Sequence, residues 1–395
     1  MPNNKNQHFV PQFYLGNFSA DPNGRSVGLF NFAQQLYVPG ASIKSQCSRD
    51  YWHGDDDPVF EESVKGLEGL GAAAIKACIL TDKLHKPRTL KTFVMFQLGR
   101  TAFAAEAFAE SRDKMHRLTY GRPPEENELD PKHNIGMYLM NEPILRDMAG
   151  CLVVNRTKLD FVTSDNPVAL CNWWYQHVYR RRPGPGIGLA QAGLEIYLPL
   201  SPKHQFILYD PNIWSIPKAS AAGVVILKDE WDIFALNERQ VLNAHHNVYF
   251  AASKETSEHV VNLSKECGDR RKPEKVRVTE WVQAKDDPRR FVRPGSPDAA
   301  SKIREKMIST EPNEIEPGRR IALFSRRYIP RFDEHPSAVG PLRDLAWMQI
   351  VEDFRRELKD GKLKPSDIED YAAAHPVFDN VKTWKRDYWE VRKAG

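Results

Sequence analysis

EIYLPLSPKHQFILY, residues 195–209, decides the fold class of this chain. Two apolar runs, 195–200 and 205–209, flank the short link Ser201-Pro-Lys-His204, which is the pattern of an antiparallel hairpin. A second hairpin is expected over 26–38, directly after the turn signal Asp21-Pro-Asn-Gly24. Further strands are expected at 159–163 and 248–252. Together these segments predict a small, mostly antiparallel sheet.

Helical periodicity occupies much of the remaining chain. Apolar residues at helical spacing predict helices over 58–80, 87–118, 136–150, 233–248 and 341–359. The predicted fold is therefore α+β, a helical bundle packed on the small sheet, with a helical C-terminal extension. We expect a core domain over 1–265, a basic linker or long loop over 266–318 and the extension over 319–395.

Composition narrows the class of protein. The chain has 395 residues, of which 41% are apolar, and a mean hydropathy of −0.55 indicates a water-soluble core. It contains no run of the roughly 18–20 apolar residues that a membrane span needs, and no apolar segment typical of a secretory signal follows Met1. Five cysteines without a CxxC spacing fit reduced thiols, so a cytoplasmic protein without a membrane partner is expected.

Positive charge is concentrated in residues 270–331, which hold 17 Lys or Arg against 9 Asp or Glu. Because the whole chain has a net charge of +4, the rest is acidic by about four. Such a stretch can attract nucleic acid, and four aromatic residues within it could stack on bases: Trp281, Phe291, Phe324 and Tyr328. A solvated surface segment explains the same charge.

Several common catalytic motifs are missing. The sequence has no Walker A, GxSxG, HExxH or DFG-like motif. His245 and His246 are adjacent, and neighbours on a helix point about 100° apart, so they make a poor bidentate metal site. We interpret this pair as structural.

Four polar groups stand within apolar sequence and are the candidate site. His8 lies in the aromatic N-terminal stretch QHFVPQFYLGNF, residues 7–18. Glu61 and Glu68 share one helix face about 10.5 Å apart, while Gln97 and Arg100 are side by side at i,i+3. The fourth group, Thr163-Ser-Asp-Asn-Pro-Val168, follows a strand and includes Asp165 and Asn166. Each group has a structural alternative: a core imidazole, solvated carboxylates, a buried ion pair and a capped turn.

These motifs also resemble a known family. His8-x-x-Pro11-x-x-Tyr14-Leu15, Cys47-x-x-x-Tyr51, Glu61 to Glu68, Gln97-x-x-Arg100-Thr101, Thr163 to Val168 and Asn243-Ala244 before Val248-Tyr249 occur in order. The series is similar to the bacterial domain-of-unknown-function family numbered 4238, over about residues 5–255. Two departures are Gly16, where a basic residue is expected, and Ala102, where Pro is common. The resemblance implies an α+β domain and transfers no reaction.

The leading functional hypothesis is a phosphodiester hydrolase, a nuclease-like effector of bacterial defence or toxin type. His8 would act as general acid or base, Arg100 would stabilise the phosphoryl group, Gln97 would orient water, and Asn166 completes the catalytic set. Asp165 with Glu61 or Glu68 would hold Mg²⁺ or Mn²⁺ through oxygen ligands. A metal-free version using His8, Arg100 and Asp165 is equally open.

The alternative hypothesis is a non-catalytic module that binds nucleic acid or protein. In that case the polar groups form a buried network that fixes the N-terminal segment, and the C-terminal helices bind a partner. The sequence leaves substrate, metal and oligomeric state open.

Overall fold

The computed structural model describes residues 6–52, 58–125, 131–178, 188–271, 275–286, 291–302, 306–312, 315–327, 343 and 345–376. Its main sheet has the strand order β11-β5-β9-β8-β7. The strands are β5 (Ala149–Asn155), β7 (Ala169–Cys171), β8 (Glu195–Ser201), β9 (His204–Tyr209) and β11 (Val224–Leu227). All pairs are antiparallel except β11 with β5, and Leu198 lies opposite Phe206 in the predicted hairpin β8–β9.

A second sheet has the order β3-β2-β12-β6, and β1 pairs separately with β4. The strands are β1 (Asn6–His8), β2 (Ser26–Asn31), β3 (Leu36–Ser42), β4 (Ser48–Asp50), β6 (Thr163–Ser164) and β12 (Asn247–Phe250). The predicted hairpin over 26–38 is β2–β3, while the strand expected over 159–163 is reduced to β6. The chain between β5 and β6 instead hydrogen bonds to α7 (Glu230–Asn243), through Asn237 and the backbone of 160–162.

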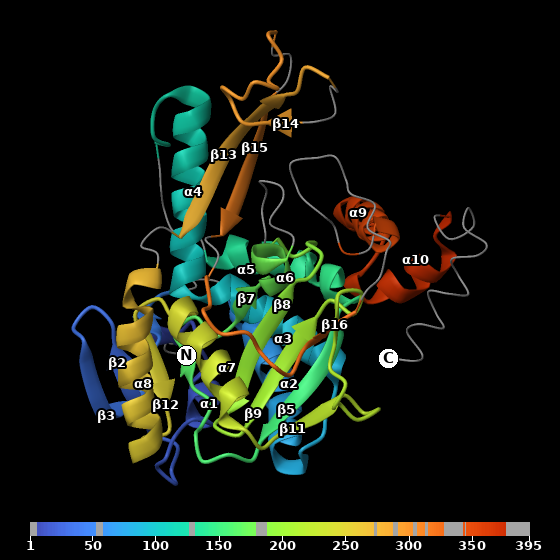
Figure 1. Cartoon of the computed structure of the whole chain (residues 1–395). Coiled ribbons are helices and arrows are strands. Elements are labelled where there is room, and N and C mark those ends of the chain that lie inside the picture. The colour runs from blue at the N-terminus through green and yellow to red at the C-terminus, as the bar shows by residue number, and fades with distance from the viewer. Residues whose placement is uncertain are drawn as a thin grey trace.

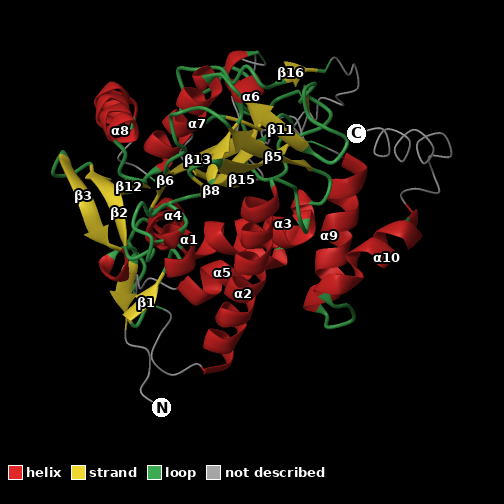
Figure 2. Ribbon diagram, turned by 90° about the horizontal axis from the view of Figure 1, so that it is seen from below, coloured by secondary structure: helices red, strands yellow, loops and turns green. Residues whose placement is uncertain are grey.

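Helices cover both faces of the main sheet (Figure 2). On one side lie α2 (Pro58–Thr81), α3 (Pro87–Arg100) and α5 (Pro131–Met140), and on the other lie α6 (Trp173–His177) and α7. Alternate residues of β5 serve the two cores: Leu152 and Val154 pack with α2 and α3, whereas Cys151 and Val153 pack with α7. The remaining helices of the core are α1 (Gln12–Gly16), α4 (Ala102–Tyr120) and α8 (Lys254–Cys267). The α+β prediction is confirmed.

The single helix predicted over 87–118 is in fact two helices. Thr101 has extended backbone angles, with φ −69° and ψ 157°, and its hydroxyl accepts a hydrogen bond from the Ala104 N–H at 3.1 Å. Thr101 therefore ends α3 and caps α4. The prediction of one helix over 136–150 was also wrong. In the structure α5 ends at Met140, a short 3₁₀ turn η2 (Glu142–Leu145) follows, and β5 starts at Ala149.

The segment 266–318, predicted as a linker or long loop, contains a sheet. Its strands are β13 (Val276–Gln283), β14 (Phe291–Val292) and β15 (Lys306–Pro312). Figure 1 shows this ribbon beside α4, and together they project from the body as an arm. The chain then returns to the body, where Ile315, Leu323 and Phe324 join the core and β16 (Ser325–Arg326) pairs with β10 (Trp214–Ser215).

Of the extension predicted over 319–395, residues 319–327 belong to the body and 377–395 lie outside the described residues. Residues 345–376 are mainly helical, with α9 (Leu345–Lys359), a 3₁₀ turn η4 (Pro365–Asp367) and α10 (Ile368–Ala374) around a small apolar cluster. Arg343 fastens it to the body, because its buried guanidinium donates to both carboxylate oxygens of Asp147 at 2.7 and 3.0 Å. Two further 3₁₀ turns are η1 (Ile43–Ser45) and η3 (Gly268–Arg270).

None of the helices in the described part of the chain is both long and apolar enough to cross a membrane. The five cysteines are all buried and none forms a disulfide.

Candidate functional site

The N-terminal segment is held down by its aromatic residues, as the sequence suggested. Tyr14 and Phe18 are buried, and the Tyr14 hydroxyl donates to the carbonyl of Pro199 at 2.6 Å and contacts Thr163 Oγ1 at 2.9 Å. Through β1 the segment also pairs with β4, with Gln7 opposite Arg49 and His8 opposite Ser48. The segment therefore links the strand β6 to the strand β4, which carries Arg49.

Gln97 and Arg100 hydrogen bond to the backbone of this segment. Gln97 Nε2 donates to the carbonyl of Phe9 at 3.0 Å, and Arg100 donates to the carbonyl of His8 and to Glu68 Oε1, the latter at 2.7 Å. Both side chains are 1% exposed, and burial lowers the pKa of Arg100 while Glu68 opposes the shift. Among the described residues, Gln97 Oε1 and Arg100 Nε find no hydrogen-bond partner. Most of the hydrogen bonds of Gln97 and Arg100 are thus made to other groups of the same chain.

His8 contributes its carbonyl to Arg100, whereas its imidazole turns elsewhere. Nδ1 contacts the carbonyl of Gln46 at 3.0 Å and Nε2 contacts the Gln12 amide at 2.8 Å. Desolvation is the main reason why the pKa of His8 is lowered. The imidazole predicted to act as general acid or base is therefore bound to Gln46 and Gln12.

The carboxylates predicted to hold a metal have separate partners. Glu61 accepts from Gln7 Nε2 at 2.7 Å, and Glu68 pairs with Arg100. Asp165 accepts from three consecutive backbone N–H groups, of His245 and His246 at 2.8 Å and of Asn247 at 3.1 Å. In the described ranges no three His, Cys, Asp or Glu side chains are grouped to hold a metal ion. The predicted set Glu61, Glu68 and Asp165 is not assembled.

Asp165 and Asn166 fix the turn between α7 and β12. The Asn166 amide donates to the carbonyl of Asn243 at 3.1 Å, and Thr101 Oγ1 donates to Asn166 Oδ1 at 3.3 Å. Burial raises the pKa of Asp165, and its hydrogen bonds from the turn oppose this shift. Thr101, which binds Asn166, directly follows Arg100 in sequence. The turn held by Asp165 and Asn166 is therefore close to Arg100 along the chain.

The turn that Asp165 holds presents His245 to a carboxylate on α4. His245 Nε2 lies 3.0 Å from Glu106 Oε2, and Glu106 also pairs with Arg49 at 3.1 Å and Lys275 at 3.4 Å. The His246 ring lies 3.7 Å from the His245 ring, centroid to centroid, and His246 is exposed. We call these five residues the Glu106 cluster: Arg49, Glu106, His245, His246 and Lys275.

The charges of the Glu106 cluster are set by its contacts. The hydrogen bond with His245 is the main cause that lowers the pKa of Glu106 to about 2, so Glu106 is anionic at neutral pH. Desolvation, followed by the charge of His245, lowers the pKa of His246. The cluster therefore combines an ionised carboxylate, two cations and an exposed imidazole that favours its neutral form.

Sequence reasoning missed this cluster because its members come from four distant segments. Arg49 lies on β4, Glu106 on α4, His245 and His246 on the turn after α7, and Lys275 before β13. The one available signal was the pair His245-His246 inside the motif from Asn243 to Tyr249, which we interpreted as structural because a helix was expected to continue to 248. The helix ends at Asn243, so the two rings lie on a turn.

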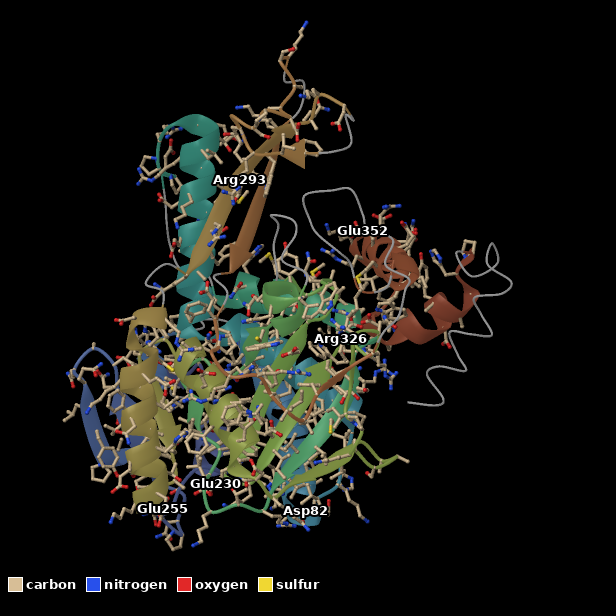
Figure 3. All side chains as sticks on the ribbon, in the orientation of Figure 1. Asp82, Glu230, Glu255, Arg293, Arg326 and Glu352 are labelled. Atoms are coloured by element: carbon tan, nitrogen blue, oxygen red, sulfur yellow. The ribbon has the colours of Figure 1, made fainter. Side chains whose placement is uncertain are left out.

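Several cations of the basic segment 270–331 bind residues of the body. Glu238, fully buried on α7, accepts from the guanidinium groups of Arg270 at 2.8 Å and Arg319 at 3.2 Å, and from the backbone N–H of Gly318 and Arg319. Arg271 lies 3.5 Å from the centre of the Phe32 ring. Two exposed cations of this segment, Arg293 on the arm and Arg326 near the body, lie far from each other (Figure 3).

The aromatic residues of the segment do not form the expected stacking surface. Trp281 and Phe324 are 3% exposed and Phe291 is half-buried, while Tyr328 lies outside the described residues. Stacking on bases therefore gains no support from the buried rings of Trp281 and Phe324.

Comparison with known proteins gives a family and no reaction. No curated protein and no solved structure matches the chain. The model of a family described as "Protein of unknown function (DUF4238)" matches residues 6–254, which include all the motifs discussed above and four of the five residues of the Glu106 cluster. The chain therefore belongs to the DUF4238 family of proteins of unknown function.

Proposed function

We propose that the chain is a metal-independent phosphodiester hydrolase whose reacting groups are those of the Glu106 cluster. The observation that carries the proposal is the position of His246, an exposed imidazole whose ring lies 3.7 Å from that of His245, which is in turn bound to Glu106. Arg49 and Lys275 supply positive charge on the same carboxylate. Two imidazoles beside two cations suit an anionic ester more than a neutral substrate.

The chemistry follows from the two histidines. A lowered pKa keeps His246 neutral, so it can accept a proton from the attacking water. His245, held by its contact with Glu106, would donate a proton to the leaving oxygen as the P–O bond breaks. Arg49 and Lys275 would attract the phosphate and stabilise charge on its oxygens. The remaining predicted residues, His8, Gln97, Arg100, Asp165 and Asn166, would then be positioning residues.

The test is incubation of purified full-length protein with end-labelled RNA and DNA, in EDTA and separately with Mg²⁺ or Mn²⁺. We expect cleavage in EDTA, a loss of at least 100-fold in His246→Ala, and unchanged cleavage in His116→Ala. His116 is a matched control because it is a half-buried histidine of α4 that lies outside the cluster. Cleavage that requires the metal would refute the metal-independent scheme and revive the predicted metal ligands.

A non-catalytic module is the second candidate, favoured by how fully the predicted polar groups bind the chain itself. Here the Glu106 cluster would bind a phosphate backbone without cutting it. Salt-dependent binding without cleavage, weakened in Lys275→Ala, would support this candidate. Absence of both binding and cleavage would remove both.

The cellular role belongs to the same proposal. A cytoplasmic defence or toxin effector that cuts nucleic acid should slow the growth of cells expressing it. His246→Ala should relieve that effect, and His116→Ala should not.

A further inference from the structure

One face of α2 is apolar and exposed. Val59 is 76% exposed, Leu70 58% and Leu80 72%. Eleven residues are close to three helical turns and ten fall about 80° short, so these three side chains lie along one side of the helix as a broad strip. Between them the strip carries only small residues: Ser63, Gly66, Ala73 and Ala77. Figure 2 shows α2 at the outer side of the helical layer.

Two glycines on this strip have no packing role in the chain itself. A Cβ built on Gly66 or on Gly69 meets no atom within 4 Å. Gly71 differs, because a Cβ there would lie 2.3 Å from the Phe93 ring of α3. A glycine inside a helix costs stability relative to alanine, so Gly71 is explained by the α2–α3 contact and the other two are not. Glycines on an outer helix face allow another helix to approach closely.

The charges at the edge of the strip are arranged for a second copy of the same helix. Glu62 and Lys76 lie on one edge, are exposed, and have no ion-pair partner within the described part of the chain. If two α2 helices pack antiparallel about the point between Gly69 and Leu70, each Glu62 lies within one residue of the position opposite the partner subunit's Lys76. In the same register Val59 meets the partner subunit's Leu80. Because the antiparallel pairing is symmetric, every contact occurs twice.

The surface at the start of α2 fits this register. A hollow lined by Pro58, Val59, Glu62 and Ser63 lies at one end of the strip, and the exposed side chain of Leu80 lies at the other. An antiparallel partner brings each Leu80 to the hollow of the opposite copy. The hollow, the exposed Leu80 side chain, the two glycines and the two charges are thus all consistent with one antiparallel arrangement.

We propose that α2 is the contact of a symmetric antiparallel homodimer. The two copies bury Val59, Leu70 and Leu80 and form two Glu62–Lys76 ion pairs between them. The contact is smaller than a standard protein interface, so the dimer dissociates at low concentration. It is independent of the chemistry proposed at the Glu106 cluster, which lies on other elements.

The test is sedimentation velocity of the full-length protein over a concentration series. We expect a monomer–dimer equilibrium, abolished by Leu70→Asp and unchanged by Ile226→Asp. Ile226 is the matched control, since it is 53% exposed and lies on β11. A monomer at every concentration, or a dimer that survives Leu70→Asp, would overturn the proposal.

A charge exchange tests the register. Glu62→Lys and Lys76→Glu should each raise the dissociation constant about tenfold, because each places like charges together in both symmetric pairs. The double variant should return to the value of the wild type. Failure of this rescue, with the single variants folded by circular dichroism, would refute the antiparallel register.

Discussion

The role of Asp165 can be tested at the three amide groups that it binds. Its carboxylate accepts from the N–H groups of His245, His246 and Asn247, two of them on Oδ2. In Asp165→Asn the carbamoyl oxygen can keep the two bonds on that side, while the NH₂ group would face the N–H of His245. One hydrogen bond to a charged group is lost and two are weakened.

The magnitude follows from these contacts. A hydrogen bond to a charged group contributes about 1.5–3 kcal/mol, and the two weakened bonds add to the loss. Burial raises the pKa of Asp165, so removing the charge recovers part of the desolvation cost. We therefore expect the turn to open more easily by about 2 kcal/mol, which is roughly a 30-fold change in its opening equilibrium.

Hydrogen exchange measured by mass spectrometry on a peptide covering 243–250 is the assay. Exchange of the three amides should accelerate by that factor in Asp165→Asn and stay unchanged in Asp113→Asn, a half-exposed carboxylate of α4 paired with Arg117. Unchanged protection of the peptide in Asp165→Asn would refute the argument that Asp165 holds the turn. Protection lost equally over the whole chain would refute a local role.

Three further predictions concern stability. Glu106→Gln should lower the free energy of unfolding by about 2 kcal/mol at pH 7, because the contacts that lower the pKa of Glu106 favour its ionised state. The difference between variant and wild type should shrink as the pH falls from 4.5 towards 2, and urea unfolding across this range measures it. Burial raises the pKa of Glu195 to about 7, so ionisation opposes folding as the pH rises from 4.5 to 7. Glu195→Gln should therefore be near neutral at pH 4 and stabilise by up to about 3 kcal/mol at pH 8, and thermal unfolding that shows no such gain would contradict it. In dilute protein, Gly66→Ala should stabilise by about 0.5–1 kcal/mol and Gly71→Ala destabilise by about 1–3 kcal/mol, opposite signs that denaturant unfolding can resolve.

The fold class could be predicted because its signals are local. The hairpin β8–β9 is encoded by two apolar runs and a short turn, and α2 by helical spacing with Pro58 in its first turn. Helix ends were harder to predict. Thr101 breaks a long apolar helix because its hydroxyl caps the next one, and that signal is easily masked by the apolar residues around it.

The candidate site could be predicted only in part. The motifs around His8, Gln97, Arg100 and Asp165 are indeed polar groups in a buried setting, but most of their partners are backbone groups, which sequence patterns do not reveal. Whether Arg100 meets a ligand or the carbonyl of His8 depends on how the N-terminal segment folds back over α3. The Glu106 cluster depends on tertiary pairing throughout, since Lys275 is 169 residues from Glu106 in sequence.

The burial of Glu238 has a consequence for any shortened form of the protein. The family model ends at residue 254, whereas the groups that hydrogen bond to the Glu238 carboxylate at 2.8–3.2 Å come from residues 270 and 318–319. A fragment cut at the family boundary would lose these partners and keep only Arg239, whose guanidinium lies 3.7 Å from Glu238. Removing the partners of a buried charge typically costs about 3–5 kcal/mol. We expect such a fragment to aggregate on expression, and a fragment extended to residue 327 to be soluble. If so, the unit that folds extends beyond the residues that the family model matches.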